Sequence, residues 1–163
     1  MSYKKKCSEM SEHEIKSCVE RKKFEDVLFD GDCELPKVYA ETTFSSCEFE
    51  GVTTCGRDLS SVLFDDCMFK NCKLYSCDFT CSVFTDCRFK LCALARSNFT
   101  GAVFKRAYFI DNTWWLSTLD QALVGYEYAS VAECEFFAAY AALEAARNKT
   151  DVAYDAAKER VGR

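Results

Sequence analysis

The stretch FDDCMFKNCKLYSCDFTCSVFTDCRF, residues 64–89, decides the fold, because a large apolar residue recurs in it at every fifth position. The same spacing continues on both sides of this stretch. The large residues separated by multiples of five are Phe24, Phe29, Phe44, Phe49, Leu59, Phe64, Phe69, Leu74, Phe79, Phe84, Phe89, Leu94, Phe99, Phe104, Phe109, Trp114 and Leu119. A helix repeats about every 3.6 residues and a strand about every 2, so neither element alone explains the period. The sequence therefore predicts a repeat protein.

A small residue precedes each large one by two positions, as Cys67 precedes Phe69. Residues two apart in an extended segment point to the same side. Each five-residue unit therefore sends one small and one large side chain inward and leaves three positions outside. The unit is a short extended side followed by a corner.

A second period of twenty residues indicates how many sides make one turn. Two unbroken phenylalanine columns appear at this spacing: Phe24, Phe44, Phe64, Phe84, Phe104 and Phe29, Phe49, Phe69, Phe89, Phe109. Four sides per coil, and about five coils, follow from these columns. Stacked coils would lie about 4.8 Å apart, which lets the phenyl rings stack with an offset.

One of the four sides departs from the pattern in the first two coils. Glu34 and Thr54 stand where the column requires a large apolar residue, whereas Leu35 and Cys55 lie one residue later. The chain returns to register at Leu59. We therefore expect a one-residue bulge on this side in coils one and two.

Several of the twelve cysteines occupy the small inward position. Cys47, Cys67 and Cys87 form one column, and Cys72 and Cys92 another. A thiol there is a compact hydrophobe that fills the gap beside a ring. A disulfide or metal ladder is the alternative, because the stacked Cα atoms fall within disulfide range. Packing is favoured, since the thiols alternate freely with Val, Ala, Ser and Thr. Three cysteines lie off the columns and are candidates for exposed thiols: Cys33, Cys55 and Cys81.

The remaining composition predicts a soluble cytoplasmic protein with reduced thiols and no bound metal or cofactor. Lys4, Lys5 and Lys6 are followed by a polar segment, and the longest apolar run, residues 136–143, is too short to span a bilayer. The chain has no CxxC pair and only one histidine, His13, in a charged stretch. No membrane association is expected.

The five-residue pattern resembles that of the pentapeptide-repeat family, with SNFTG at 97–101 and CDFTC at 77–81 as its closest copies. The resemblance covers residues 24–119. It implies a right-handed, quadrilateral parallel β-helix, a solenoid of about five coils. On this basis residues 1–23 form an N-terminal capping segment, residues 24–123 the β-helix, and residues 124–163 a C-terminal cap.

Both ends carry signals for capping helices, which an open solenoid needs to cover its end coils. Ser11 and Glu14 form a capping box before a short helix over residues 12–22. The pattern of residues 124–163 predicts an α-helical hairpin, whose first helix is apolar nearly all round. A homodimer or partner contact through this region is therefore an alternative to simple capping. Its candidate contact residues are Phe136, Phe137, Tyr140 and Leu143.

The sequence carries no catalytic constellation, so we expect a protein that is not an enzyme and that works through its outer surface. Charge on that surface is segregated along the coil. Residues 24–66 hold eleven acids against Lys37 and Arg57, a net charge of −9, whereas residues 67–106 have a net charge of +5. The candidate partner-binding acids are Glu25, Asp26, Asp30, Glu48, Glu50, Asp65, Asp66 and Asp86.

Two hypotheses for function follow. Members of the family that confer quinolone resistance resemble duplex DNA and bind DNA gyrase, and the resemblance implies partial DNA mimicry toward gyrase or another DNA-binding enzyme, without direct nucleic-acid binding. The alternative is an interaction scaffold or bacterial effector that acts through the C-terminal helices. The acids could also be a solvated face, in which pairs such as Glu50 and Lys70 contribute little to stability.

Overall fold

The computed structural model describes residues 4–38, 40–113, 116–118 and 123–124. The described residues all belong to one compact unit of the chain. The predicted C-terminal hairpin, with Phe136, Phe137, Tyr140 and Leu143, lies outside the described residues. None of the helices in the described part of the chain is long and apolar enough to cross a membrane.

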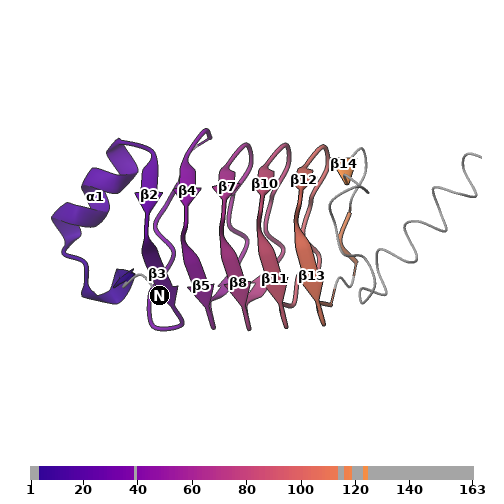
Figure 1. Ribbon diagram of the computed structural model, residues 1–163, viewed down its shortest axis with the longest axis horizontal. Helices are drawn as coiled ribbons and strands as arrows, with labels where there is room; N and C mark the ends of the chain where they lie inside the picture. The colour runs from indigo at the N-terminus through magenta and orange to yellow at the C-terminus, as the bar shows by residue number, and fades with distance from the viewer. Residues whose placement is uncertain (1–3, 39, 114–115, 119–122, 125–163) are drawn as a thin grey trace, which may run out of the picture. The chain divides into compact units, whose positions relative to one another are not determined.

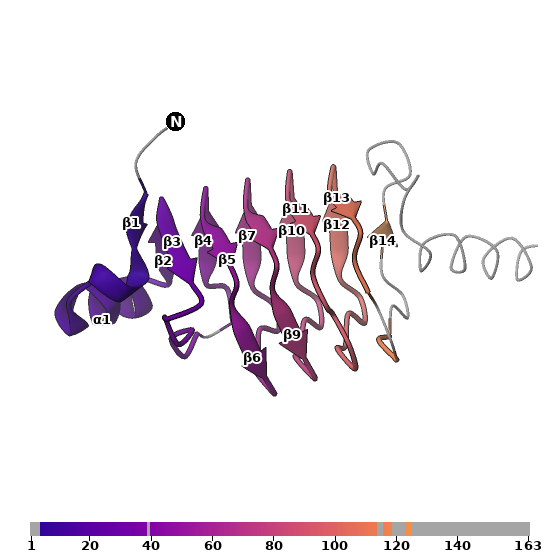
Figure 2. The same cartoon turned by 90° about the horizontal axis from the view of Figure 1, so that it is seen from below.

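Two six-stranded parallel sheets run the length of the coil (Figure 1). Sheet A has the order β1 (Lys5–Lys6), β3 (Val27–Asp30), β5 (Glu48–Glu50), β8 (Met68–Lys70), β11 (Arg88–Lys90), β13 (Tyr108–Ile110). Sheet B has the order β14 (Leu123–Val124), β12 (Val103–Lys105), β10 (Val83–Thr85), β7 (Leu63–Asp65), β4 (Thr43–Ser45), β2 (Lys23–Glu25). A third sheet pairs β6 (Thr53–Cys55) with β9 (Lys73–Tyr75), and Figure 2 shows it on another side of the coil. Bridges such as that between Asp78 and Asn98 join the fourth side.

The strands are stacked in the register that the sequence predicts. Phe64 pairs with Phe44 and Phe84, each twenty residues away. Within a column the rings are nearly parallel, with the Phe49 and Phe69 centroids 4.5 Å apart and their planes at 4°. Between columns the rings meet edge to face, as Phe64 meets Phe69 at 5.4 Å and 68°. The two phenylalanine columns are confirmed, and the core is the interior of the coil.

The corners of the coil are built from residues in the left-handed region of φ. In most units the corner residue lies two positions after the large residue, and examples are Asp66 at 50°, Leu91 at 55° and Gly101 at 66°. Glycine, asparagine and aspartate adopt this conformation at lower cost than other residues. Most of these corners nevertheless carry other side chains, so the stacking of coils must outweigh the local strain.

The N-terminal cap is confirmed in part and is more extensive than expected. Helix α1 (Glu12–Glu20) begins with the predicted capping box of Ser11 and Glu14 and packs against β2. Before it, a 3₁₀ helix, η1 (Cys7–Glu9), follows β1, which adds a strand to sheet A beside β3. This extra strand was not predicted, because two consecutive lysines show no apolar alternation.

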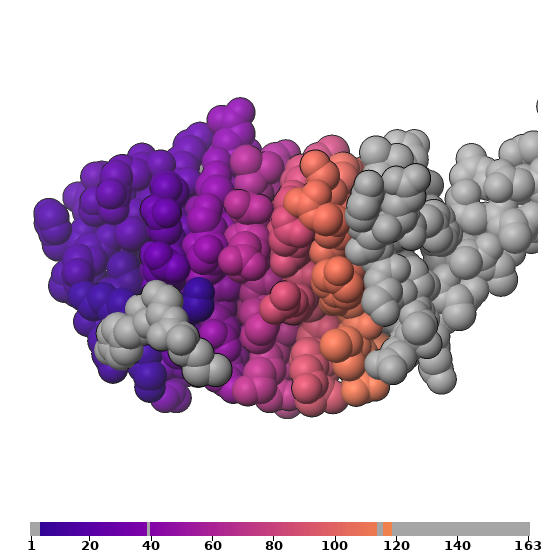
Figure 3. Space-filling model, viewed as in Figure 1, coloured from indigo at the N-terminus to yellow at the C-terminus, as the bar shows by residue number. Residues whose placement is uncertain are grey.

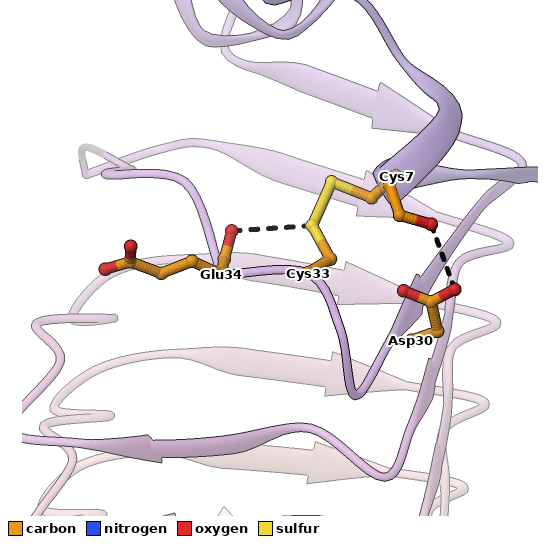
Figure 4. The surroundings of a disulfide bond; sticks show 5 residues. Cys7, Asp30, Cys33 and Glu34 are labelled. Atoms are coloured by element: carbon orange, nitrogen blue, oxygen red, sulfur yellow. Dashed lines mark hydrogen bonds between the residues drawn. A yellow bond between two sulfur atoms is a disulfide. The ribbon is translucent and has the colours of Figure 1, made fainter.

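The prediction that all thiols are reduced is wrong for one pair. Cys7 and Cys33 form a disulfide with their Cα atoms 6.1 Å apart, and it fastens the N-terminal segment to coil one (Figure 4). Cys33 is therefore not a free exposed thiol, whereas Cys55 and Cys81 are exposed and free as predicted. The pairing could not be read from sequence, because Cys7 precedes the repeat and has no place in its columns.

The predicted bulge forms in coil one only. Leu35 is buried and Glu34 exposed, so the chain is shifted by one residue there. In coil two the prediction is wrong: Thr54 pairs in register with Leu74, and Cys55 is exposed. The physical reason is that β6 keeps its hydrogen-bonded ladder with β9, which fixes the register even though a threonine then occupies the large inward position.

Candidate functional site

The outer face of sheet A follows the charge gradient of the sequence. Two columns of side chains make up this face: Leu28, Glu48, Met68, Arg88, Tyr108 and Asp30, Glu50, Lys70, Lys90, Ile110. The successive coils appear as bands of colour, from indigo to orange, in the space-filling view (Figure 3). The acidic end of this face lies at coils one and two, and the basic end at coils three and four.

The N-terminal segment supplies cations to two acids of coil one. Lys4 Nζ lies 3.9 Å from Asp26 and Lys6 Nζ lies 3.8 Å from Asp30. Asp30 Oδ2 also accepts a hydrogen bond from Ser8 Oγ at 3.1 Å. Its Oδ1 is buried and has no hydrogen-bond partner in the described chain, so separating the pair would leave a poorly solvated charge. Asp30 is therefore poorly available to a partner while the N-terminal segment is in place, whereas the side chain of Asp26 stays 56% exposed.

Three further candidate acids are held by cations of the coil itself. Glu25 lies 2.7 Å from Lys23, Glu50 lies 2.5 Å from Lys70, and Asp86 pairs with Arg106. The pairing of Glu50 with Lys70 was predicted and is confirmed. A hydrogen bond from Arg106 lowers the pKa of Asp86, and a hydrogen bond to Glu50 raises the pKa of Lys70. Because these side chains are exposed and screened by solvent, each pair contributes little to the stability of the coil.

Three of the eight candidate acids form no ion pair among the residues that the structure describes: Glu48, Asp65 and Asp66. Asp66 accepts a hydrogen bond from Ser46 at 3.3 Å. Glu48 and Asp66 line a hollow of 140 Å³ at the corner between sheets A and B, together with Lys4 and Arg88. Asp65 is exposed on the outer side of β7 next to this corner. We call Glu48, Asp65 and Asp66 the acid corner.

The inward cysteines form hydrogen bonds with main-chain carbonyl oxygens. Cys67 Sγ donates to the carbonyl oxygen of Phe44 at 3.3 Å, and Ser97 Oγ makes the equivalent bond to Leu74 at 2.9 Å. A hydrogen bond with Cys67, together with burial, raises the pKa of Cys47, and burial raises the pKa of Cys77. Cys47 and Cys77 therefore stay protonated and are poor nucleophiles or ligands. Packing was predicted, whereas the shared acceptor, the carbonyl 23 residues earlier in the chain, was not.

The described residues contain no group of three or more His, Cys, Asp or Glu arranged to hold a metal ion. A hollow of 450 Å³ lies beside coil two, lined in part by Leu35, Lys37, Arg57 and Asp58. Arg57 lies 2.5 Å from Glu34, so its charge is already paired. Asp58 in this hollow accepts hydrogen bonds from the main-chain N–H and the hydroxyl of Ser60, at 3.0 and 2.7 Å, an arrangement that closes a local turn.

The stacked parallel strands, the five-residue units and the two phenylalanine columns define a pentapeptide-repeat protein fold. Rfr23, a pentapeptide repeat protein from the cyanobacterium Cyanothece 51142, matches with a TM-score of 0.55 at 8% identity, over 71% of this chain and 97% of that chain. HetL, a pentapeptide repeat protein involved in heterocyst differentiation regulation in Nostoc sp. strain PCC 7120, gives 0.49 at 11% identity. That match covers 62% of this chain and 44% of HetL.

A trypsin-treated form of QnrB1, a plasmid-mediated fluoroquinolone resistance protein, gives a TM-score of 0.33 at 16% identity, over 66% of this chain and 69% of that chain. At these identities the likeness concerns the fold alone. The sequence matches no family model and no curated protein.

Proposed function

We propose that the protein is a non-enzymatic binding protein whose coil engages the basic surface of a protein partner through the acid corner. The observation that carries this proposal is that Glu48, Asp65 and Asp66 keep their charges unpaired among the described residues and lie together on a rigid scaffold. The interior of the described coil is filled by phenylalanine and small side chains. Its outer surface is therefore where recognition takes place.

The partner class proposed is a DNA-handling enzyme, such as DNA gyrase or another topoisomerase, whose DNA groove the acid corner occupies. The enzyme is inhibited or protected because duplex DNA is excluded. Over residues 24–123 the net charge is −6, about one charge per 4 Å for five coils about 4.8 Å apart. Duplex DNA carries about one charge per 1.7 Å. Since the candidate acids of coil one, Glu25, Asp26 and Asp30, are also paired, mimicry is partial and confined to coils two and three.

Binding to gyrase and a supercoiling assay test this function. The Asp65→Asn, Asp66→Asn double variant should weaken binding about tenfold or more, and raising the salt concentration should weaken wild-type binding steeply. The matched control is Glu12→Gln with Glu20→Gln, which removes the same charge from α1 and should leave binding unchanged. A complex that tolerates both high salt and the double variant would exclude the acid corner as the contact.

A further inference from the structure

The outer face of sheet A is self-complementary in charge. Coil two presents Glu48 and Glu50, and coil four presents Arg88 and Lys90 at the same two positions of the strand. Met68 lies between them in coil three. The sign of the charge therefore reverses about coil three, and the six charged side chains that the two columns hold in coils one to four sum to zero.

Half of the six charged side chains in the two columns form no ion pair among the described residues of their own chain. Glu48, Arg88 and Lys90 form no ion pair in the part of the chain that the structure describes. Asp30 is already paired with Lys6, and Lys70 with Glu50. Coil five adds apolar surface to the same face, because Tyr108 is 41% exposed and Ile110 is 38% exposed.

We propose that this face binds a second copy of the chain in an antiparallel, face-to-face dimer. The twofold axis runs parallel to the strands of sheet A and passes through coil three. Such an axis reverses the order of the coils in the second copy and places each column opposite the same column of the first copy. Glu48 then faces the second copy's Arg88, and Glu50 faces its Lys90. Each contact occurs twice in the dimer.

The same twofold axis also places apolar side chains opposite one another. Leu28 of coil one faces Tyr108 of coil five, and Met68 faces its own counterpart on the axis. Asp30, which Lys6 neutralises, faces Ile110. Lys70 also faces its counterpart, but its charge is offset within its own chain by Glu50, 2.5 Å away.

The other face-to-face arrangement is repulsive, which selects the antiparallel one. A twofold axis along the coil would keep each coil opposite itself and exchange the two columns. Glu48 would then face the second copy's Glu50, and Arg88 would face its Lys90. Like charges placed opposite one another disfavour an interface strongly.

The face is small, so we expect the dimer to have a low affinity. Five coils about 4.8 Å apart span about 24 Å, and three-residue strands span about 10 Å. A patch of this size buries less than the roughly 1,200 Å² of a stable interface. The dimer should therefore form at high protein concentration and dissociate as salt is added. The dimer shares Glu48 with the acid corner but needs neither Asp65 nor Asp66. The Asp65→Asn, Asp66→Asn variant should therefore weaken partner binding and leave the dimer intact, which separates the two proposals.

Sedimentation equilibrium of the full chain across a range of concentrations, with charge-reversal variants, tests the dimer. Glu48→Arg alone and Arg88→Glu alone should each weaken association at least about tenfold, because both contacts become repulsive. An equimolar mixture of the two single variants should associate again, since every contact then joins an arginine to a glutamate. The double variant Glu48→Arg with Arg88→Glu should also regain association.

Matched controls reverse the same charges on the outer side of sheet B. Glu25→Arg and Lys105→Glu should leave the association constant within about twofold, because both side chains lie off the proposed interface. A protein that stays monomeric at every concentration would overturn the dimer. So would a dimer that is insensitive to both single changes, which would place the contact elsewhere, including the region of Phe136 and Tyr140.

Discussion

At the scale of single residues, the inward small position is specified by volume, and several of the polar residues that occupy it add a hydrogen bond. Cys67, Ser97 and Asn112 all donate to the main-chain carbonyl 23 residues earlier in the chain. A thiol combines a weak donor with apolar volume, so it satisfies this carbonyl while it packs against the rings. The abundance of cysteine in the coil thus follows from packing chemistry.

Two substitutions at Cys67 should separate the effect of its hydrogen-bond donor from the effect of its side-chain volume. Cys67→Ser keeps the donor and should change the free energy of unfolding by less than about 1 kcal/mol. Cys67→Leu must fit extra atoms into a site that is 1% exposed, and should destabilise the coil by about 1–3 kcal/mol. Urea denaturation measures both, with Cys55→Leu at an exposed position as the control. If the Cys67→Leu protein were as stable as wild type, the interior could not be tightly packed.

The corner residue Leu91 is placed in an unfavourable conformation for its type. Its φ is 55° and its side chain is 49% exposed, so little packing compensates the strain. Leu91→Asn should raise the free energy of unfolding by about 0.5–1 kcal/mol, because asparagine adopts this region more readily. Thermal denaturation gives the change. The reciprocal variant Gly101→Ala should destabilise the coil, since its new Cβ would lie 3.3 Å from Cys81 Sγ at a φ of 66°.

At the scale of elements, the start of α1 couples folding to pH. The hydrogen bond from Lys5 and the bonds from Ser11 lower the pKa of Glu14 from 4.5 to about 2. A lowered carboxyl pKa stabilises the folded state above the unfolded pKa, and this stabilisation is lost as the pH falls from about 4.5 toward about 2. Glu14→Gln should therefore remove stability at pH 7 and have no effect at pH 2. NMR titration of the Glu14 carboxyl measures the pKa, and an ordinary value near 4.5 would contradict the contacts seen.

The elements also show which features could be predicted from the sequence. The strands of the two phenylalanine columns and α1 were predicted because period and capping residues are local signals. The shift at Leu35 was predicted because the apolar residue itself moves by one position. The bulge at Cys55 was predicted wrongly because an exposed and a buried cysteine look alike in sequence. Strand β1 was missed because its place beside β3 depends on a contact with coil one and not on any pattern of its own.

At the scale of the whole molecule, the axial charge gradient was predicted from sequence, but the pairing of its acids was not. Counting acids against cations along the coil revealed the gradient without placing the N-terminal lysines on the acids of coil one. Lys4 and Lys6 reach Asp26 and Asp30 only because β1 joins sheet A. The same contact helps to reduce the eight candidate acids to the three of the acid corner. The sequence alone therefore does not reveal which acids are paired where residues distant in sequence supply the counter-charge.

Stability should differ along the coil, because each coil of a solenoid is held by its neighbours. In coil three, β7 and β8 are bonded on both sides, to β4 and β10 and to β5 and β11. In coil one, residues 35–38 belong to no strand, and the N-terminal cap is fastened by a disulfide that closes a 26-residue separation. Hydrogen exchange should accordingly be slowest in coils three and four and faster in the cap and coil one.

Reduction of the Cys7–Cys33 disulfide should widen the difference in hydrogen-exchange rate between the N-terminal end and the central coils. It removes a cross-link that stabilises the folded state by about 3 kcal/mol. Exchange should accelerate in β1, α1 and coil one, whereas β8 and β11 should keep their protection. Mass spectrometry of peptide fragments with and without a thiol reductant measures both, and Cys7→Ser provides the reagent-free comparison. Equal acceleration in every coil would mean that the molecule unfolds as one cooperative unit and that the cap has no separate stability.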